Sequence, residues 1–265
     1  MSMTQSVVAK TDTSDATLHP EVLEFTSSLS LDKQMLRADL IGSLAHITML
    51  SRQKLVPADA ALSVHRGLVS MWEDAKKGSL VLPNEEDVHM AVESELARRV
   101  GAASRVLHSA RSRNDQVATD LRLHVRHSLV DASQQLLSLI TAILTYAKRD
   151  AGIVLPAYTH RQRAQPVSLA YWWASWASGF IRDLDTLEHA IEAADVLALG
   201  VGANSGTSLA IDRTVTKELL GFSKMTLNGL DTVGDRDFAL DTLYAATRLM
   251  LRIGRVSTDV IDFSI

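Results

Sequence analysis

The 265-residue sequence contains no cysteine and only 5 prolines. Without cysteine the chain can form no disulfide framework, no thiolate metal site and no cysteine nucleophile, which agrees with a reducing compartment. All five prolines lie at or before residue 166, so residues 84–155 and 167–265 are free of proline. Because a proline inside a helix costs about 3 kcal/mol, these two stretches have room for long helices.

The sequence also lacks an excess of charge of one sign and a long hydrophobic run. With 27 Lys and Arg against 31 Asp and Glu, the formal net charge is −4, so we expect no nucleic-acid partner and no attraction to anionic lipid. Residues 164–181 carry no charge and approach the length of a membrane span, but Gln165, Pro166 and three serines favour a helix buried in a bundle. The first 20 residues lack the apolar core of a signal peptide, so a cytoplasmic location is expected.

Apolar residues recur at steps of three and four along most of the chain, which is the period of an amphipathic helix. The longest such pattern runs for 31 residues from Val117 to Ala147, a rod of about 45 Å at about 1.5 Å per residue. Others cover about 31–55, 166–194 and 236 to the end, while Pro57 opens a further helix that should end at Gly78 and Asn84 begins another. No stretch shows the strict two-residue alternation of a strand bounded by turn residues.

This pattern predicts an all-α fold in three parts. Residues 1–20 form a polar tail, and residues 21–110 form an N-terminal domain of short helices. Residues 111–265 form a bundle of long helices.

Three polar segments interrupt the helical pattern, at 108–116, 158–166 and 200–213. Loops held by rigid helices are common places for binding groups. The first segment, HSARSRNDQ, lies among seven arginines against two aspartates between residues 98 and 126. A solvated helix start capped by Asn114 or Asp115 is one interpretation. A cradle for carboxylate or phosphate is the other, because a guanidinium donates two parallel hydrogen bonds to such groups.

The other two segments are YTHRQRAQP and LGVGANSGT. In the first, His160 is a candidate acid or base, because an imidazole can both give and take a proton near neutral pH. In the second, the glycine spacing misses the dinucleotide-binding fingerprint and no strand precedes it, so it is either a flexible loop or a backbone-lined binding loop. His124 and His127 lack a third ligand at helical spacing, and no metal site is expected.

Together, HSARSRNDQVATDLRL and YTHRQRAQPV, with NEEDVHMAVESEL before them and LNGLDTVGDRDF after, resemble the argininosuccinate lyases of the fumarase/aspartase superfamily. The resemblance covers nearly the whole chain from about Pro20, and within the superfamily RSRNDQ is specific to this family. It implies cleavage of argininosuccinate to arginine and fumarate by β-elimination, in arginine biosynthesis or the urea cycle. It also implies a homotetramer that needs no cofactor and no metal.

The resemblance implies roles for particular residues. His160 would be the catalytic histidine that helps to protonate the leaving nitrogen. The substrate-binding residues would be Ser28, Asp87, His89, Arg113, Asn114 and Thr159. Of these, Arg113 and Asn114 would hold a substrate carboxylate, Ser28 the amino-acid end and Thr159 the fumarate portion, while Asp87 and His89 would lie near the site.

The sequence also departs from the family. Ser109 and Ala110 replace a threonine and a glycine of the first loop, and Ala198 and Val201 replace a proline and a serine in the third. Family chains continue past the position of Ile265 to a mobile GSSxMPxKxNP loop whose serine is the catalytic base. Residues 1–265 alone are therefore expected to have negligible activity. The alternatives are an inactive paralogue that acts as a helical scaffold or assembly partner, and a superfamily lyase with another substrate.

Overall fold

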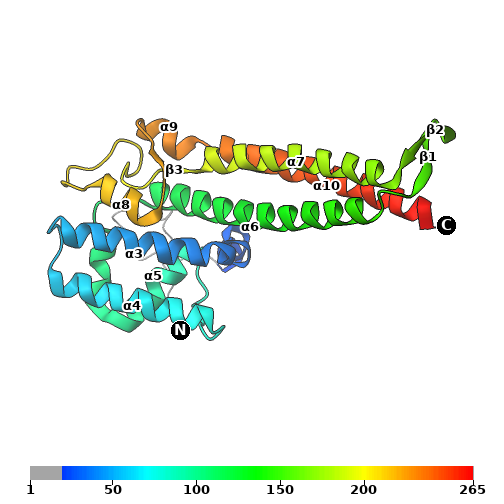
Figure 1. The fold of residues 1–265 in the computed structure, drawn as a ribbon. Coiled ribbons are helices and arrows are strands. Elements are labelled where there is room, and N and C mark those ends of the chain that lie inside the picture. The colour runs from blue at the N-terminus through cyan, green and yellow to red at the C-terminus, as the bar shows by residue number, and fades with distance from the viewer. Residues whose placement is uncertain (1–19, 265) are drawn as a thin grey trace. The chain divides into compact units, whose positions relative to one another are not determined.

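The computed structural model describes residues 20–264, and helices dominate it (Figure 1). In chain order the helices are α1 (Pro20–Thr26), α2 (Leu29–Asp32), η2 (Lys33–Met35), α3 (Leu36–Arg52), α4 (Ala58–Lys76), α5 (Val88–Val100), η3 (Gly101–His108), α6 (Arg113–Arg149), α7 (Leu169–Ala194), α8 (Arg213–Leu220), α9 (Gly229–Gly234) and α10 (Asp237–Ser264). The predicted all-α class is confirmed. The predicted polar tail lies outside the described residues, apart from Pro20.

The chain divides into two compact units, and α6 runs from one into the other. Of the described residues, the first unit contains 20–124 together with Val196–Gly234, and the second contains Val125–Asp195 and 235–264. This grouping does not test the domain division expected from the sequence, with an N-terminal domain of residues 21–110, which stays a prediction.

The first unit is built around α3, α4 and α5. Its core holds the apolar side chains that face inward from these helices, among them Leu40, Ile47, Val64, Leu68 and Leu96. The start of α4 after Pro57 and its end before Gly78, which has a φ of 70°, are where the sequence predicts them. The α5 helix begins at Val88 rather than at Asn84, because the Asp87 side chain caps it by accepting a hydrogen bond from the backbone N of Met90 at 2.6 Å.

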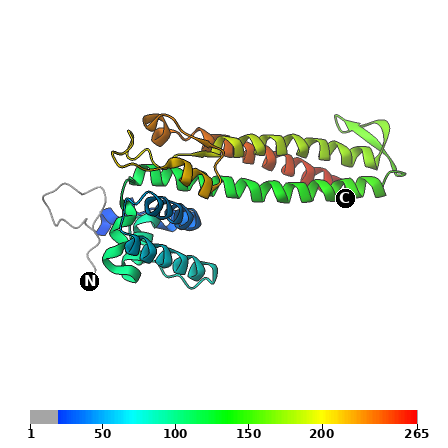
Figure 2. The same ribbon diagram turned by 60° about the vertical axis from the view of Figure 1, so that its left-hand side comes forward.

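The second unit contains three long helical segments that run side by side (Figures 1 and 2). They are residues 125–149 of α6, with α7 and α10. Phe180 and Leu187 of α7 and Phe238 of α10 are buried. The carboxylate of Asp183 on α7 is also buried and accepts hydrogen bonds from Nε and Nη2 of Arg252 on α10. Among the described residues, no helix is both long and apolar enough to span a membrane.

A β-hairpin lies at one end of this bundle, and the sequence analysis did not predict it (Figure 1). It pairs β1 (Val154–Thr159) with β2 (Gln162–Ser168) in antiparallel register. Most of its side chains are exposed or half-buried, so neither strand has a fully buried face. The two segments therefore lack the alternation of apolar and polar residues that predicts a strand with one buried face. A second sheet, in the first unit, is a parallel pair of two-residue strands, β3 (Val196–Leu197) and β4 (Lys224–Met225).

Candidate functional site

Arg113 and Asn114 stand at the start of α6, where the sequence predicts an anion-binding cradle. Nη1 of Arg113 donates to Oε1 of Gln116 at 2.6 Å, and its Nη2 lies 3.2 Å from Oε2 of Glu93. The Asn114 side chain is exposed, and its Nδ2 donates to the carbonyl of Ala203 at 3.3 Å. The guanidinium of Arg113 is therefore held by Gln116 and Glu93. The amide of Asn114 is exposed and contacts the third polar segment, 200–213.

Asp87 and Ser28 lie on two segments that are joined by backbone hydrogen bonding. The backbone N of Ser28 donates to the carbonyl of Glu86 at 2.9 Å. The hydroxyl of Ser28 donates to the carboxylate of Asp32. Asp87 uses Oδ1 to cap α5, and its Oδ2 lies 4.0 Å from Nε of Arg113. Asp87 is thus both a helix cap and a distant counter-charge for the proposed carboxylate-binding arginine.

His89 does not reach the surface. Its side chain is buried between two carboxylates, with Nδ1 at 3.3 Å from Oδ2 of Asp120 and at 3.8 Å from Oδ1 of Asp39. Gly42 on α3 leaves room for this arrangement, because a Cβ there would lie 2.9 Å from Oδ1 of Asp120. The cluster therefore combines one residue each from α3, α5 and α6.

The charges of this cluster follow from its burial and its pairing. Burial alone would lower the pKa of His89, but the neighbouring carboxylates of Asp120 and Asp39 outweigh it and raise that pKa to about 10. Burial would raise the pKa of Asp39, but His89 and the nearby Arg111 lower it. Burial raises the pKa of Asp120 to about 6. At neutral pH the cluster is thus an imidazolium between two carboxylates.

Asp39, His89 and Asp120 are also a set that could hold a metal ion, since they offer three ligand atoms within 4.8 Å of one another. Nδ1 of His89 faces both carboxylates, however, so a metal ion there would have to displace its proton. The guanidinium of Arg111 lies in the same buried region, where its Nη1 donates to the hydroxyl of Ser43. It adds a second positive charge there. The donor set therefore fits a balanced ion cluster better than a metal site.

A chain of hydrogen bonds joins this cluster to Arg113. Nε2 of Gln116 donates to Oδ1 of Asp39 at 2.7 Å, and Oε1 of the same amide accepts from Arg113. Glu93 adds a charge on the other side: burial would raise its pKa, but His108, Arg113 and Arg111 lower it to about 2. Because Gln116 and Glu93 both contact the guanidinium, the buried cluster contributes to the position of Arg113.

Asp39, Gln116 and Asp120 have no predicted site role from the sequence. A usable signal exists within α3, where the polar Asp39, Ser43 and His46 recur at steps of four and three and are all buried. That spacing puts three polar side chains on one face of an otherwise apolar helix, which indicates a buried polar partner.

Thr159 and His160 lie in the second unit, on the β1–β2 hairpin. His160 and Arg161 form its turn with φ values of 52° and 60°, a left-handed conformation that usually selects Asn or Gly. The His160 side chain is exposed. Thr159 and Gln165 line a hollow of about 660 Å³ on the hairpin.

The residues that depart from the family also have defined places. Ala110 has a φ of 58°, so a residue with a Cβ occupies a left-handed position where the family has glycine. Ala198 and Val201 are buried.

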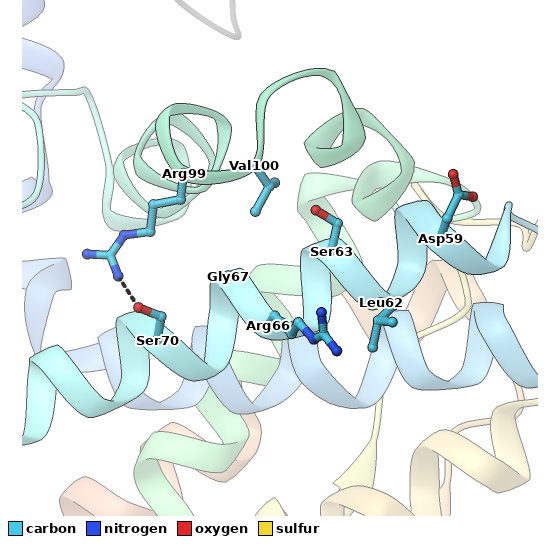
Figure 3. Close-up of a pocket in the computed structure, with 8 residues that line it drawn as sticks. All are labelled: Asp59, Leu62, Ser63, Arg66, Gly67, Ser70, Arg99 and Val100. Atoms are coloured by element: carbon cyan, nitrogen blue, oxygen red, sulfur yellow. Dashed lines mark hydrogen bonds between the residues drawn. The ribbon is translucent and has the colours of Figure 1, made fainter.

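Another hollow, of about 590 Å³, lies between α4 and α5 (Figure 3). Its lining residues are Asp59, Leu62, Ser63, Arg66, Gly67, Ser70, Arg99 and Val100. Arg99 is already engaged, because it donates to Ser70 at 2.9 Å and pairs with Asp74 and Glu95, each at 2.8 Å. None of the predicted site residues lines this hollow, so we do not place the site there.

Comparison with known proteins shows one family. The sequence matches a family described as Lyase over residues 15–264. It is 41% identical over 241 residues to argininosuccinate lyase of Syntrophus aciditrophicus (strain SB), covering 91% of this chain and 51% of that protein. It is 39% identical over 244 residues to argininosuccinate lyase of Geotalea daltonii (strain DSM 22248 / JCM 15807 / FRC-32), covering 92% and 53%. The chain thus spans about half the length of the curated relatives it matches.

Solved structures share the fold. The crystal structure of EDDS lyase in complex with formate matches with a TM-score of 0.80 at 23% identity, covering 91% of this chain and 48% of that one. The crystal structure of fumarate lyase:delta crystallin from Brucella melitensis bound to cobalt matches with a TM-score of 0.75 at 16% identity, covering 89% and 56%.

Proposed function

Since this chain belongs to the Lyase family, within the fumarase/aspartase superfamily, we propose that the protein is an argininosuccinate lyase that cleaves argininosuccinate to arginine and fumarate by β-elimination. The observation that carries the proposal is the RSRNDQ segment, in which Arg113 and Asn114 are the first two residues of α6. The identity of about 40% to curated argininosuccinate lyases supports the same substrate.

The proposed chemistry assigns the developing charge to Arg113 and Asn114. The elimination removes a proton from the carbon next to a carboxylate, and negative charge builds on that carboxylate. A guanidinium and an amide are donors suited to hold it, and donors that are fixed before the reaction stabilise such charge most. The contacts of Arg113 with Gln116 and Glu93 provide that fixation. His89 would act on the site through Asp39 and Gln116 without touching substrate.

His160 is proposed to protonate the departing nitrogen, with Thr159 binding the fumarate portion. The left-handed turn at His160 and Arg161 supports a functional role, because strained non-glycine positions of this kind cost about 1–3 kcal/mol and cluster at functional sites. Ser28 is proposed to contact the amino-acid end of the substrate, and Asp87 to support Arg113.

We further propose that the protein acts in the cytoplasm as a homotetramer, without a cofactor. An exposed apolar stripe on α10 supports self-association, since its members recur at helical spacing and a large exposed patch marks an interaction surface. The stripe comprises Leu240, Leu243, Tyr244 and Leu251. A monomer in light scattering at micromolar concentration would contradict the assembly proposal.

The activity is tested by following fumarate absorbance with argininosuccinate as substrate. Because the chain spans about half the length of its relatives, it is assayed alone and after co-expression with a chain that carries the family's serine loop. We expect negligible turnover alone and restored turnover after co-expression. His160→Ala should slow the restored reaction at least about tenfold, since a general acid or base contributes about 10²–10⁴ in rate.

The control variant is His65→Ala, because His65 is exposed on α4 and plays no part in the proposed site. An unchanged rate in His160→Ala would remove His160 from the mechanism. No turnover with argininosuccinate, together with turnover of another member of a substrate panel, would replace the proposed substrate. No turnover of any substrate after verified co-assembly would favour a non-catalytic scaffold.

A further inference from the structure

The segment Leu199–Thr207 is an ordered loop whose backbone folds back on itself. Gly200, Gly202 and Gly206 have φ values of 98°, 61° and 85°, and the backbone N of Gly206 donates to the carbonyl of Val201 at 2.6 Å. Gly202 must be glycine for a second reason, because a Cβ there would lie 2.7 Å from the carbonyl oxygen of Gly206. Residues 203–207 at its tip are exposed.

One buried carboxylate joins this loop to the start of α6. Asp115 is fully buried. Its Oδ2 accepts from the backbone N of Gly200 at 2.8 Å and of Gly202 at 2.9 Å, while its Oδ1 accepts from the backbone N of Ser112 at 2.9 Å. The Oδ1 contact is an ordinary helix-start cap, but the Oδ2 contacts cross 85 and 87 residues of sequence and have no role in capping.

Arg213 holds the other side of the same loop. Its Nε donates to the carbonyl of Leu199 at 2.9 Å, its Nη2 to that of Leu197 at 3.0 Å, and its Nη1 to that of Thr226 at 2.9 Å. A Cβ at Gly200 would lie 2.7 Å from the Cγ of Arg213. The carboxylate of Asp115 thus holds the loop through two of its backbone N–H groups. The guanidinium of Arg213 holds the carbonyl of Leu199 and two carbonyls outside the loop.

We infer that Asp115 is a positioning residue that fixes the loop Leu199–Thr207 beside Arg113 and Asn114, so that the loop tip forms one wall of the substrate-carboxylate site. The contact of Asn114 Nδ2 with the carbonyl of Ala203 at 3.3 Å shows the tip in that place. The inference rests on the proposed function for the nature of the ligand. The position of the loop itself rests on the hydrogen bonds of Asp115 and Arg213.

Hydrogen exchange of the purified chain, followed by mass spectrometry with and without argininosuccinate, tests the inference. Asp115→Asn keeps a cap acceptor for Ser112 but replaces the oxygen that accepts from Gly200 and Gly202 by an amide group. We expect loop amides of 199–207 to exchange at least about tenfold faster, with α4 unchanged, and the argininosuccinate concentration for half-protection of 108–116 to rise at least about tenfold. Asp212→Asn is the control, because it changes an aspartate that caps α8 into another good cap.

If Asp115→Asn does not fold, Gly206→Ala keeps the inference testable. Nothing lies within 4 Å of a Cβ at Gly206, so this variant disturbs only the left-handed backbone of the loop, and faster loop exchange with weaker protection is again expected. Loop exchange in Asp115→Asn equal to that of the wild type would overturn the inference. A wild-type chain in which argininosuccinate protects no segment would instead contradict the proposed function, while the ligand-free exchange would still decide whether Asp115 fixes the loop.

Discussion

Nδ1 of His89 lies 3.3 Å from Oδ2 of Asp120, and both side chains are only 2% exposed. Asp39 stands on the other side of the imidazole at 3.8 Å. Removing one partner of a buried ion pair leaves an uncompensated charge away from water, which costs more than the pair itself contributes. The cluster therefore makes the first unit sensitive to any change that removes the proton or the ring of His89.

His89→Gln should destabilise the chain by about 3–5 kcal/mol, because it removes one of the two cations, His89 and Arg111, that balance the buried carboxylates of Asp39 and Asp120. Urea unfolding followed by circular dichroism measures this change in the free energy of unfolding. His65→Gln is the matched control, since His65 is exposed on α4 and its substitution should change stability by less than about 0.5 kcal/mol. Equal stabilities of the two variants would contradict the ion cluster.

The same pair predicts a pH dependence with a defined sign. The pKa of His89 is raised from 6.5 to about 10 in the folded chain, so between these values the folded chain holds a proton that the unfolded chain releases. Its contribution to stability is complete below about pH 6.5 and is lost as the pH rises toward 10, with a slope of at most about 1.4 kcal/mol per pH unit. Nitrogen NMR of the ring tests the assignment directly: His89 should be doubly protonated at pH 8, and a neutral ring at that pH would refute it.

Ala110→Gly should stabilise the chain by about 0.5–1 kcal/mol. Ala110 has a φ of 58°, and the left-handed conformation costs an L-residue about 1–2 kcal/mol that it does not cost glycine. The greater entropy of glycine in the unfolded chain offsets part of this gain. Ala97→Gly is the same substitution inside α5 at an exposed position and should destabilise by about 1 kcal/mol. Thermal unfolding compares them, and shifts of the same sign would count against this account of Ala110.

Gly179→Ala should destabilise the second unit by about 1–2 kcal/mol, net of about 1 kcal/mol that alanine gains over glycine inside a helix. A Cβ at Gly179 would overlap Nη1 of Arg252, whose guanidinium is held by the buried carboxylate of Asp183. The arginine must either move away from its partner or strain the helix contact, and overpacking of this kind costs about 1–3 kcal/mol before any loss of the ion pair. Ser178→Ala, on the exposed side of the same helix, should be nearly neutral in the same melting experiment.

The long helices and several of their ends could be predicted from the sequence, because these depend on residues that are near one another along the chain. Apolar spacing places α6, α7 and α10, and Pro57 and Gly78 bracket α4. The RSRNDQ segment likewise stands at a helix start. The hairpin at 154–168 could not be read in this way, since its strands bury neither face and so carry no alternation.

The surroundings of the predicted site residues depend on how distant segments pack, and the roles of these residues stay predictions. His89 is a residue that sequence reasoning places near substrate, yet it is enclosed by carboxylates that come from two other helices. The sequence predicts Asp115 as a possible helix cap, but in the structure its carboxylate also accepts hydrogen bonds from the backbone N of Gly200 and Gly202. Both outcomes depend on contacts between segments tens of residues apart. Such contacts form only when helices pack and exclude water, and no local pattern of residues encodes them.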